Sequence, residues 1–320
     1  MKNRGNPTLG IFRERRNIDY FEFKAPHYEL AHFELYKKLL QKGIQLAILM
    51  GQSTYVSGNQ FSRHWQVVFE KRLSPKFLPA GAVEPNLILV KDELKFDERA
   101  STLNNSEIIE IAANKQRTYE LFSDLQPTTF VAKNKSELAV ALDKLAGDSV
   151  VVKGFYGNSG QTVEIGLKED VLSNKWVWPV QAQEFVDTSG GIPGLVEGRH
   201  DLRVIMANNQ PILGKIRTPP RGGLKSNTGY GGNNWLIAVD SLPRDVLSLT
   251  KSIDNRLSSI SPWRLYSIDL GLTNRGYRLF ELNDKPGVVS LSQGEPATFY
   301  QNAYVDFLVN ATKWYAERAL

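Results

Sequence analysis

Two carboxylates and an amide occupy neighbouring alternating segments near the end of the chain. A hairpin centred on Arg275 places Asp269 opposite Glu281, with Asn283 on the same face and Phe280 on the opposite face. A bulge near the turn would shift this register by one residue. With no cation between them, opposed carboxylates are destabilising, and a hard cation such as Mg²⁺ would resolve the conflict. The alternative is a solvated face of an edge hairpin.

A second segment combines a lysine with regularly spaced glycines. An apolar strand runs into Lys153, and Gly154, Gly157 and Gly160 follow. Glycines let backbone N–H groups approach oxygen atoms, and lysine adds a positive charge, so this pattern is typical of a loop that covers phosphates. The spacing matches neither the Walker A motif nor G-x-G-x-x-G. Taken alone, the loop also fits an ordinary glycine-rich turn.

Two arginines bracket a third candidate, the hairpin over residues 202–216. Arg203 and Arg217 suit bidentate binding of phosphate or carboxylate. A basic, glycine-rich stretch follows over residues 221–232, and such a stretch is also compatible with RNA. Its aromatic residues are too few and too irregular for a base-stacking platform. Each arginine considered singly is compatible with a solvated surface position.

The elements that must position these residues begin with a small α/β arrangement. Residues 9–12, 44–50 and 85–90 are apolar runs that predict strands, and residues 28–41 have helical spacing, closed by Gly43. The strand–helix–strand order predicts a parallel sheet in the first hundred residues.

The rest of the chain predicts a larger mixed region. Helices are expected from about Asn114 for a dozen residues, near residues 135–145, and at about residues 298–317. Strands are expected at residues 128–131, 149–153, 182–186, 202–207 and 211–216, besides the hairpin near residues 274–276.

Composition narrows the function classes. The chain has 320 residues, 42% of them hydrophobic, and no cysteine, which excludes disulfides, thiolate metal sites and cysteine nucleophiles. Its four histidines lack metal-binding spacing. The net charge of +5 permits nucleic acid but equally fits an enzyme of phosphate and carboxylate substrates. No apolar run predicts a signal peptide or a membrane span, so we expect a cytoplasmic protein.

The order of these motifs resembles the ATP-grasp superfamily, in particular the branch of bacterial glutathione synthetase and the ribosomal-protein glutamate ligase. The resemblance runs from about Asn114 to Gly287. It rests on the segment 114–117, the Lys153 loop, the hinge-like segment 183–186, the arginine strands, and the Asp269, Glu281 and Asn283 pattern. It implies an α/β N-terminal domain followed by an α+β ATP-grasp fold whose two subdomains clasp ATP.

The same resemblance implies a role for each matched residue. The nucleotide-binding positions would be Lys115, Lys153, Gly157, Ser159, Gly160, Gln183, Glu184, Phe185, Val186 and Asp187. The catalytic positions would be Arg203, Arg217 and Asn227. Asp269, Glu281 and Asn283 would hold one or two Mg²⁺ ions, with Mn²⁺ as a substitute.

The chain departs from the family pattern after the hinge. Residues 188–200 form a longer connection than we expect for the family, which puts the ribose contact in doubt and leaves Asp187 as its nearest candidate. His200, at the end of this connection, is either a proton shuttle or a loop histidine without a role in the chemistry. We expect three parts: an N-terminal substrate-side domain over residues 1–112, a central subdomain over 113–186 and a C-terminal subdomain over 187–320.

The implied activity is ATP- and Mg²⁺-dependent ligation of a carboxylate to an amine through an acyl phosphate, releasing ADP and phosphate. The alternatives are an ATP-binding regulatory or interaction module without ligase activity and a phosphotransferase on the same fold. The carboxylate would belong to a small molecule, a peptide or a protein. We expect neither a membrane nor a nucleic acid as partner, and relatives of this type also allow a homo-oligomer.

Overall fold

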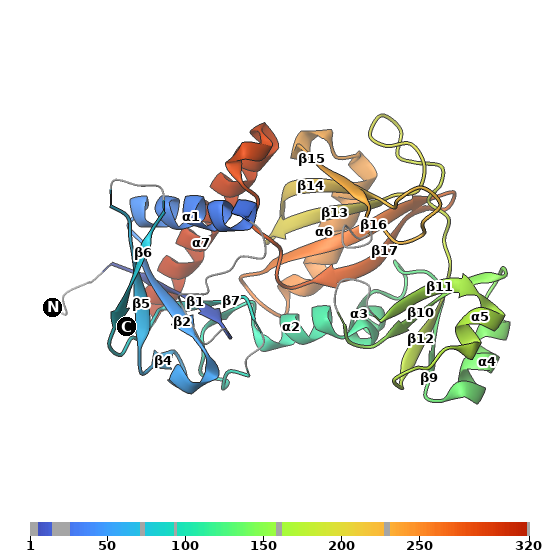
Figure 1. The fold of residues 1–320 in the computed structure, drawn as a ribbon, viewed down its shortest axis with the longest axis horizontal. Helices are drawn as coiled ribbons and strands as arrows, with labels where there is room; N and C mark the ends of the chain where they lie inside the picture. Colours follow the sequence, from blue (N-terminus) through green and yellow to red (C-terminus); the bar gives the residue numbers. More distant parts are fainter. Residues whose placement is uncertain are drawn as a thin grey trace. The chain divides into compact units, whose positions relative to one another are not determined.

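The computed structural model describes residues 6–14, 26–70, 74–92, 95–157, 162–226 and 231–318. The chain divides into two compact units, whose elements are shown in Figure 1. Unit 1 comprises Met1–Ser106, Ser261–Leu265 and Lys285–Leu320. Unit 2 comprises Glu107–Ile260 and Tyr266–Asp284.

Unit 1 is built on a six-stranded sheet with the order β6-β5-β2-β1-β7-β8. Its strands are β1 (Thr8–Arg13), β2 (Gln45–Met50), β5 (His64–Val68), β6 (Lys76–Ala80), β7 (Leu87–Val90) and β8 (Thr102–Leu103). Helix α1 (Pro26–Gln41) packs on β2, and the C-terminal helix α7 (Glu295–Arg318) packs on α1 and β7. Strands β3 (Tyr55–Ser57) and β4 (Gln60–Phe61) form a separate small ladder.

The parallel sheet predicted for this region is confirmed for four of its strands and wrong for two. Strands β2, β1, β7 and β8 pair in parallel, whereas β5 and β6 extend the sheet antiparallel at one edge. The central strands are nearly continuous buried runs, and this is what made them visible in the sequence. Strand β6 is mostly exposed, so it carries no comparable apolar signal.

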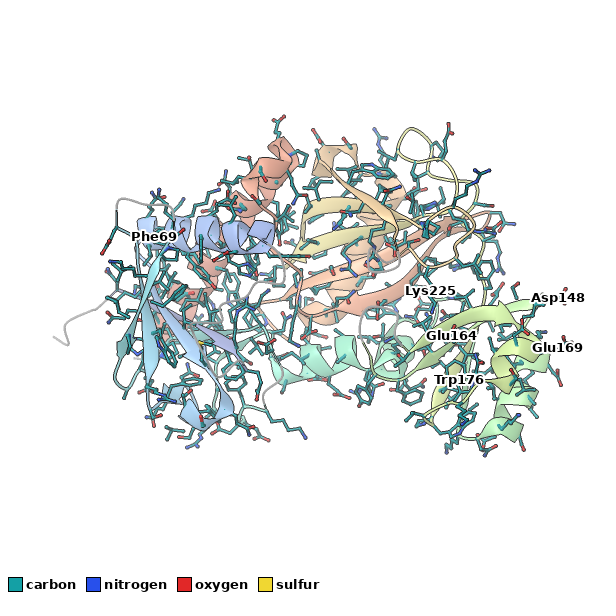
Figure 2. All side chains as sticks on the ribbon, viewed as in Figure 1. Phe69, Asp148, Glu164, Glu169, Trp176 and Lys225 are labelled. Carbon is teal, nitrogen blue, oxygen red and sulfur yellow. The ribbon has the colours of Figure 1, made fainter. Side chains whose placement is uncertain are left out.

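Unit 2 contains a four-stranded antiparallel sheet with the order β11-β10-β12-β9. Its strands are β9 (Thr129–Ala132), β10 (Ser149–Gly154), β11 (Val163–Leu167) and β12 (Val180–Glu184). Helices α4 (Lys135–Lys144) and α5 (Lys168–Ser173) cover one face (Figure 1). Trp176, labelled in Figure 2, packs against this core and donates from Nε1 to the Val171 carbonyl at 2.8 Å.

The second sheet of unit 2 has five strands in the order β15-β14-β13-β16-β17. They are β13 (Asp201–Ala207), β14 (Gln210–Thr218), β15 (Asn233–Ile237), β16 (Leu265–Thr273) and β17 (Gly276–Asn283). Its core also includes residues of α2 (Ser106–Ala113), α3 (Lys115–Phe122) and α6 (Arg244–Ser258). Alternation buries Leu202, Ile216 and Ile268 in this core. The charged neighbours of these residues are therefore presented on the opposite face.

The β16–β17 hairpin confirms the predicted pairing of Asp269 with Glu281, but by a different geometry. Thr273 pairs with Gly276, so the turn is one residue tighter than a hairpin centred on Arg275. A register shift between Asp269 and Leu270 leaves Phe280 as an extra residue, which restores the predicted pairing. The carboxylates are thus opposite each other because of a bulge that the sequence analysis did not locate.

Among the described helices, none combines the length and apolar character needed to cross a membrane. Residues 285–320 are grouped with the N-terminal segment in unit 1. The three-part division expected from the sequence stays a prediction.

Candidate active site

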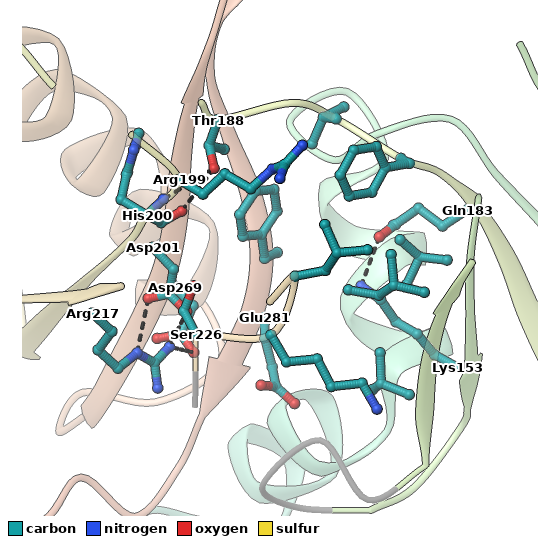
Figure 3. Close-up of a pocket in the computed structure, with 18 of the residues that line it drawn as sticks. Lys153, Gln183, Thr188, Arg199, His200, Asp201, Arg217, Ser226, Asp269 and Glu281 are labelled. Atoms are coloured by element: carbon teal, nitrogen blue, oxygen red, sulfur yellow. Dashed lines mark hydrogen bonds and ion pairs between the residues drawn. The ribbon is translucent and has the colours of Figure 1, made fainter. Parts of the chain in front are cut away.

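A pocket lies between the two sheets of unit 2, and Figure 3 shows the side chains that line it. The cavity encloses about 160 Å³. The first sheet contributes Lys153 and Gln183 to it, and the second contributes Arg217, Asp269 and Glu281. The structure therefore brings together several residues that lie far apart in the sequence.

One part of the pocket is an apolar slot. Val151, Val163 and Ile165 line it from the first sheet, Phe185 from the segment after β12, and Phe280 from β17. Apolar and aromatic walls with a few polar groups are typical of sites that bind small molecules. This slot is next to the expected hinge, where Glu184 and Val186 also line the pocket.

Two lysines enter the pocket from elements that the sequence predicted. Lys115 begins α3, capped by the Asn114 side chain, and its Nζ donates to the Gly157 carbonyl at 2.9 Å. Lys153 ends the buried run of β10, and its Nζ donates to Oε1 of Gln183 at 2.6 Å. Both lysines are 8% exposed. Burial, together with the Lys115 charge, lowers the pKa of the Lys153 ammonium group to about 8.

The second sheet presents a cluster of arginines and aspartates centred on Asp269. Arg203 donates to both Asp269 oxygens, from Nε at 2.6 Å and from a terminal nitrogen at 2.7 Å. Arg217 donates to Asp269 at 2.7 Å and also holds both oxygens of Asp201. Figure 3 shows the contacts of Arg217. The register explains the cluster, because Asp201 is directly opposite Arg217 on β13 and β14.

The electrostatics of this cluster differ between its two aspartates. Asp269 is fully desolvated, yet the two guanidinium groups hold its pKa well below the ordinary value, so it remains ionised. Burial and the neighbouring Asp269 charge raise the pKa of Asp201, which shares one arginine with Asp269. The positive charge of Arg217 is correspondingly stabilised, and its pKa is raised.

One premise of the predicted metal site is wrong. We expected no cation between the two carboxylates, but Asp269 has two arginine partners and Glu281 lies 3.3 Å from Lys115. Charge repulsion across the hairpin is therefore already relieved by the protein. Arg203 lies on β13 and Lys115 on α3, and both elements are far from the hairpin in the sequence. Only the folded chain brings them next to it.

The donor set nevertheless fits a magnesium ion shared with phosphate. Asp269 accepts three hydrogen bonds, and a carboxylate has about four lone-pair positions. The Asn283 amide has a buried Nδ2 without a hydrogen-bond partner, and a turned amide would present an oxygen there. Among the described residues, no three His, Cys, Asp or Glu side chains form a metal site on their own. An ion at these residues would thus need phosphate or water oxygens to complete its octahedron.

Several expected site residues lie outside the pocket wall or have other partners. Arg203 and Asn283 are not part of the pocket lining. Asp187 also lies outside it, where its carboxylate accepts from the Ser189 amide at 3.0 Å. The Glu184 carboxylate is paired with Arg275 in the β16–β17 turn. Ser159, Gly160 and Asn227 lie outside the described residues.

His200 connects the long 188–200 segment to β16. Its Nε2 accepts from the Leu272 amide at 3.2 Å, which requires the proton on Nδ1, 3.1 Å from the Gly198 carbonyl oxygen. Thr188 Oγ1 donates to the His200 carbonyl at 3.0 Å. Burial lowers the pKa of His200, so the ring stays neutral. These hydrogen bonds anchor the connection at β16, and His200 also lines the pocket.

Phe280 lies on the face opposite to the predicted one, and some other residues of the pocket wall were not predicted. The bulge breaks the alternation of β17, so Phe280 and Glu281 both line the pocket. Gly271 permits this, since a Cβ at that position would lie 2.3 Å from Phe280 Cζ. Lys225, 3.6 Å from Glu164 of β11 (Figure 2), was also missed. Gly271, between Leu270 and Leu272 in a predicted strand, was the sequence signal for this close packing.

Comparison with known proteins places this geometry in a fold class. No family model matches the chain. A probable alpha-L-glutamate ligase 2 of Shewanella baltica is 22% identical over 231 residues, which are 66% of this chain and 68% of that protein. A glutathione synthetase of Agrobacterium fabrum is 28% identical over 119 residues, which are 35% of this chain and 34% of that protein.

Solved structures extend the likeness over nearly the whole chain. D-alanyl-alanine synthetase A from Vibrio cholerae matches with a TM-score of 0.63 and 11% identity, covering 98% of this chain and 99% of that one. A RimK domain ATP-grasp protein from Sphaerobacter thermophilus matches with a TM-score of 0.60 and 12% identity, covering 94% and 99%. The chain therefore has the ATP-grasp fold. In sequence it resembles glutamate ligases and glutathione synthetases.

Proposed function

We propose that this protein is an ATP- and Mg²⁺-dependent ligase that joins a carboxylate to an amine. The carboxylate would attack the γ-phosphorus of ATP to form an acyl phosphate and ADP, and the amine would then displace phosphate from the acyl carbon. The observation that carries the proposal is one pocket in which two buried lysines face an arginine–carboxylate cluster. The names of the curated relatives support the same reaction class.

Nucleotide binding would use the side of the pocket formed by the first sheet. The apolar slot would hold adenine between Val151, Ile165 and Phe280, with the segment 183–186 at the ring edge. Lys115 and Lys153 would bind phosphate oxygens, and Gly157 lines the same pocket. The ribose contact of Asp187 stays a prediction, because this carboxylate is engaged with Ser189.

The second sheet would contribute the groups that handle charge during the transfer. Glu281, Asn283 and the remaining lone pair of Asp269 would hold one or two Mg²⁺ ions, with Mn²⁺ as a substitute. A bound ion would neutralise negative charge on the transferring phosphoryl group. Arg203 would neutralise charge near the γ-phosphate, and Arg217 would steady the acyl phosphate. The resemblance assigns Asn227 to the same role as Arg217. The protein would act by positioning and charge stabilisation, without a covalent intermediate on a side chain.

Product analysis tests the proposal against its alternatives. Purified protein is incubated with Mg²⁺, ATP, and pools of carboxylates and amines, and ADP, AMP and phosphate are resolved. ADP and phosphate formed only with both pools support the ligase. ADP without release of phosphate indicates a phosphotransferase, and AMP with pyrophosphate contradicts the acyl-phosphate route. Binding of Mg-ATP without turnover, even with peptides and proteins as acceptors, favours the regulatory module.

The remaining expectations are part of the proposal. The substrate pair would be a small-molecule, peptide or protein carboxylate and an amine, with no nucleic-acid partner. The three-part division of the chain, a cytoplasmic location and a homo-oligomer stay predictions of the same kind.

A further inference from the structure

The cationic side chains around the pocket are not all neutralised by the protein. Lys115 has Glu281, Arg203 has Asp269, and Arg217 is shared by Asp201 and Asp269. Lys153 faces the neutral Gln183 amide, where the proposed nucleotide phosphates would bind. The part of the chain that the structure describes offers Lys215 no hydrogen bond or ion pair. Its charge has no assigned use in the proposed binding of ATP.

Lys215 is located by register on the same face as the arginine–carboxylate cluster. It is directly opposite Arg203 on β13 and two residues from Arg217 on β14. Its neighbours Gly214 and Ile216 face the other way, where Ile216 is fully buried. Lys215 therefore continues the charged face of the sheet beyond the residues that line the pocket.

The electrostatics favour an anion at Lys215. Its ammonium group is half-buried beside two guanidinium groups, and the nearby aspartates are already held by those arginines. Burial and the charges of Arg203 and Arg217 lower the pKa of Lys215 to about 8. An anionic ligand would restore the favourable charge balance.

We propose that Lys215 binds a second anionic group of the carboxylate substrate, an inference that rests on the proposed function. The preferred acid would then be a dianion. Successive residues on one face of a strand are about 7 Å apart, so the two anionic groups of the substrate would be separated by a short chain of a few carbon atoms. The reacting carboxylate would lie at Arg217, and the second anionic group, a further carboxylate, would lie at Lys215. The selectivity of the enzyme for its acid would then depend on a residue outside the nucleotide pocket.

Calorimetric titration of the full chain tests this selectivity without requiring turnover. The probes are the dianions glutarate and succinate and the monoanion butyrate, each titrated with Mg²⁺ and a non-hydrolysable ATP analogue present. We expect at least one dianion to bind about tenfold or more tighter than butyrate, the effect of one charge-assisted hydrogen bond. Lys215→Met should reduce this preference to less than about twofold, and Lys215→Arg should retain most of it.

The control is Lys251→Met, which removes an exposed lysine of α6 and should keep the preference. Equal binding of the three acids, no binding of either dianion, or a preference that survives in Lys215→Met would overturn the proposal. Titration with the nucleotide analogue alone shows whether the proposed function fails as well, because a protein without that function would not bind the analogue. A protein that binds nucleotide but does not distinguish the acids rejects only the role of Lys215.

Discussion

Lys153 and Lys115 enter the same pocket with different partners, and the difference decides how each responds to a nucleotide. Lys115 is compensated by Glu281, whereas Lys153 donates to a neutral amide in a buried position. The Glu281 carboxylate offsets only part of the effect of burial on Lys153, so a bound phosphate would add a negative charge where the ammonium group is under-compensated. We therefore expect Lys153 to contribute more than Lys115 to the pH dependence of binding.

Lys153→Met should weaken binding of Mg-ATP by about 10- to 100-fold, because a charge-assisted hydrogen bond is lost. In the unaltered protein, the Kd for ATP should rise as pH increases through about 8, where Lys153 loses its proton. The variant should lack that rise. Calorimetric titration between pH 7 and pH 9.5 measures both effects, and equal affinities for the two proteins would mean that the loop is only a turn.

Glu281→Gln should abolish Mg²⁺-dependent formation of ADP while leaving the fold intact. The amide keeps the shape of the side chain but removes the charge that a cation and Lys115 both need, so Mg²⁺ activation should fall by at least about tenfold. ADP formation is measured against Mg²⁺ concentration, with circular dichroism as the check on folding. The control, Glu169→Gln, changes an exposed carboxylate on α5. Full Mg²⁺-dependent activity in Glu281→Gln would show that the hairpin is not the metal site.

At the scale of elements, the β16–β17 hairpin shapes the pocket through one bulge and one glycine. The bulge turns Phe280 into the pocket beside Glu281, and Gly271 leaves the space that the ring occupies. The long 188–200 connection is close to the same point, because Thr188 Cγ2 would lie 2.7 Å from a Cβ on Gly271. The position of Phe280 in the wall of the apolar slot thus requires that residue 271 be a glycine.

Gly271→Ala should destabilise the protein by about 1–3 kcal/mol, the usual cost of overpacking, and should also weaken nucleotide binding. The reason is that the new methyl group would force Phe280 and Thr188 to move. Denaturant unfolding and ATP titration measure the two effects. Gly190→Ala is the control, since Gly190 lies exposed in the 188–200 connection and no atom is within 4 Å of its Cβ position. If the two variants behave alike, the close packing at Gly271 has no effect on the site.

At the scale of the whole molecule, each unit contains a buried neutral histidine. In unit 1, His32 Nε2 accepts from Arg13 at 3.1 Å while Nδ1 donates to the Tyr28 carbonyl at 2.7 Å. Burial and the Arg13 charge lower the pKa of His32 to about 3. In unit 2, His200 is likewise kept neutral by burial.

The free energy of unfolding should therefore decrease as the pH falls below about 6.5. The unfolded chain binds protons at these histidines there, whereas the folded chain does not until a lower pH. For His32 the loss between pH 7.5 and pH 5 should be about 2 kcal/mol. Denaturant unfolding at the two pH values measures it, and His32→Gln should flatten the dependence. A dependence that is unchanged in this variant would contradict the neutral, buried assignment.

The sequence by itself determined most of the element order and the residue types of the site. Lys153 was recognisable because an apolar strand runs directly into it, and the Asp269–Glu281 pairing because alternation and a short turn are local properties. The order of the motifs also indicated the fold, which the solved structures confirm.

Only the tertiary structure decided which charges meet. The partners of Asp269 come from β13 and β14, more than 50 residues away, and the partner of Glu281 comes from α3. Strand β6 at the sheet edge and the bulge at Phe280 were also invisible, because neither leaves a periodic apolar signal. Periodicity reports the burial of each element, whereas the pairing of strands that are distant in the sequence sets the charge of the pocket.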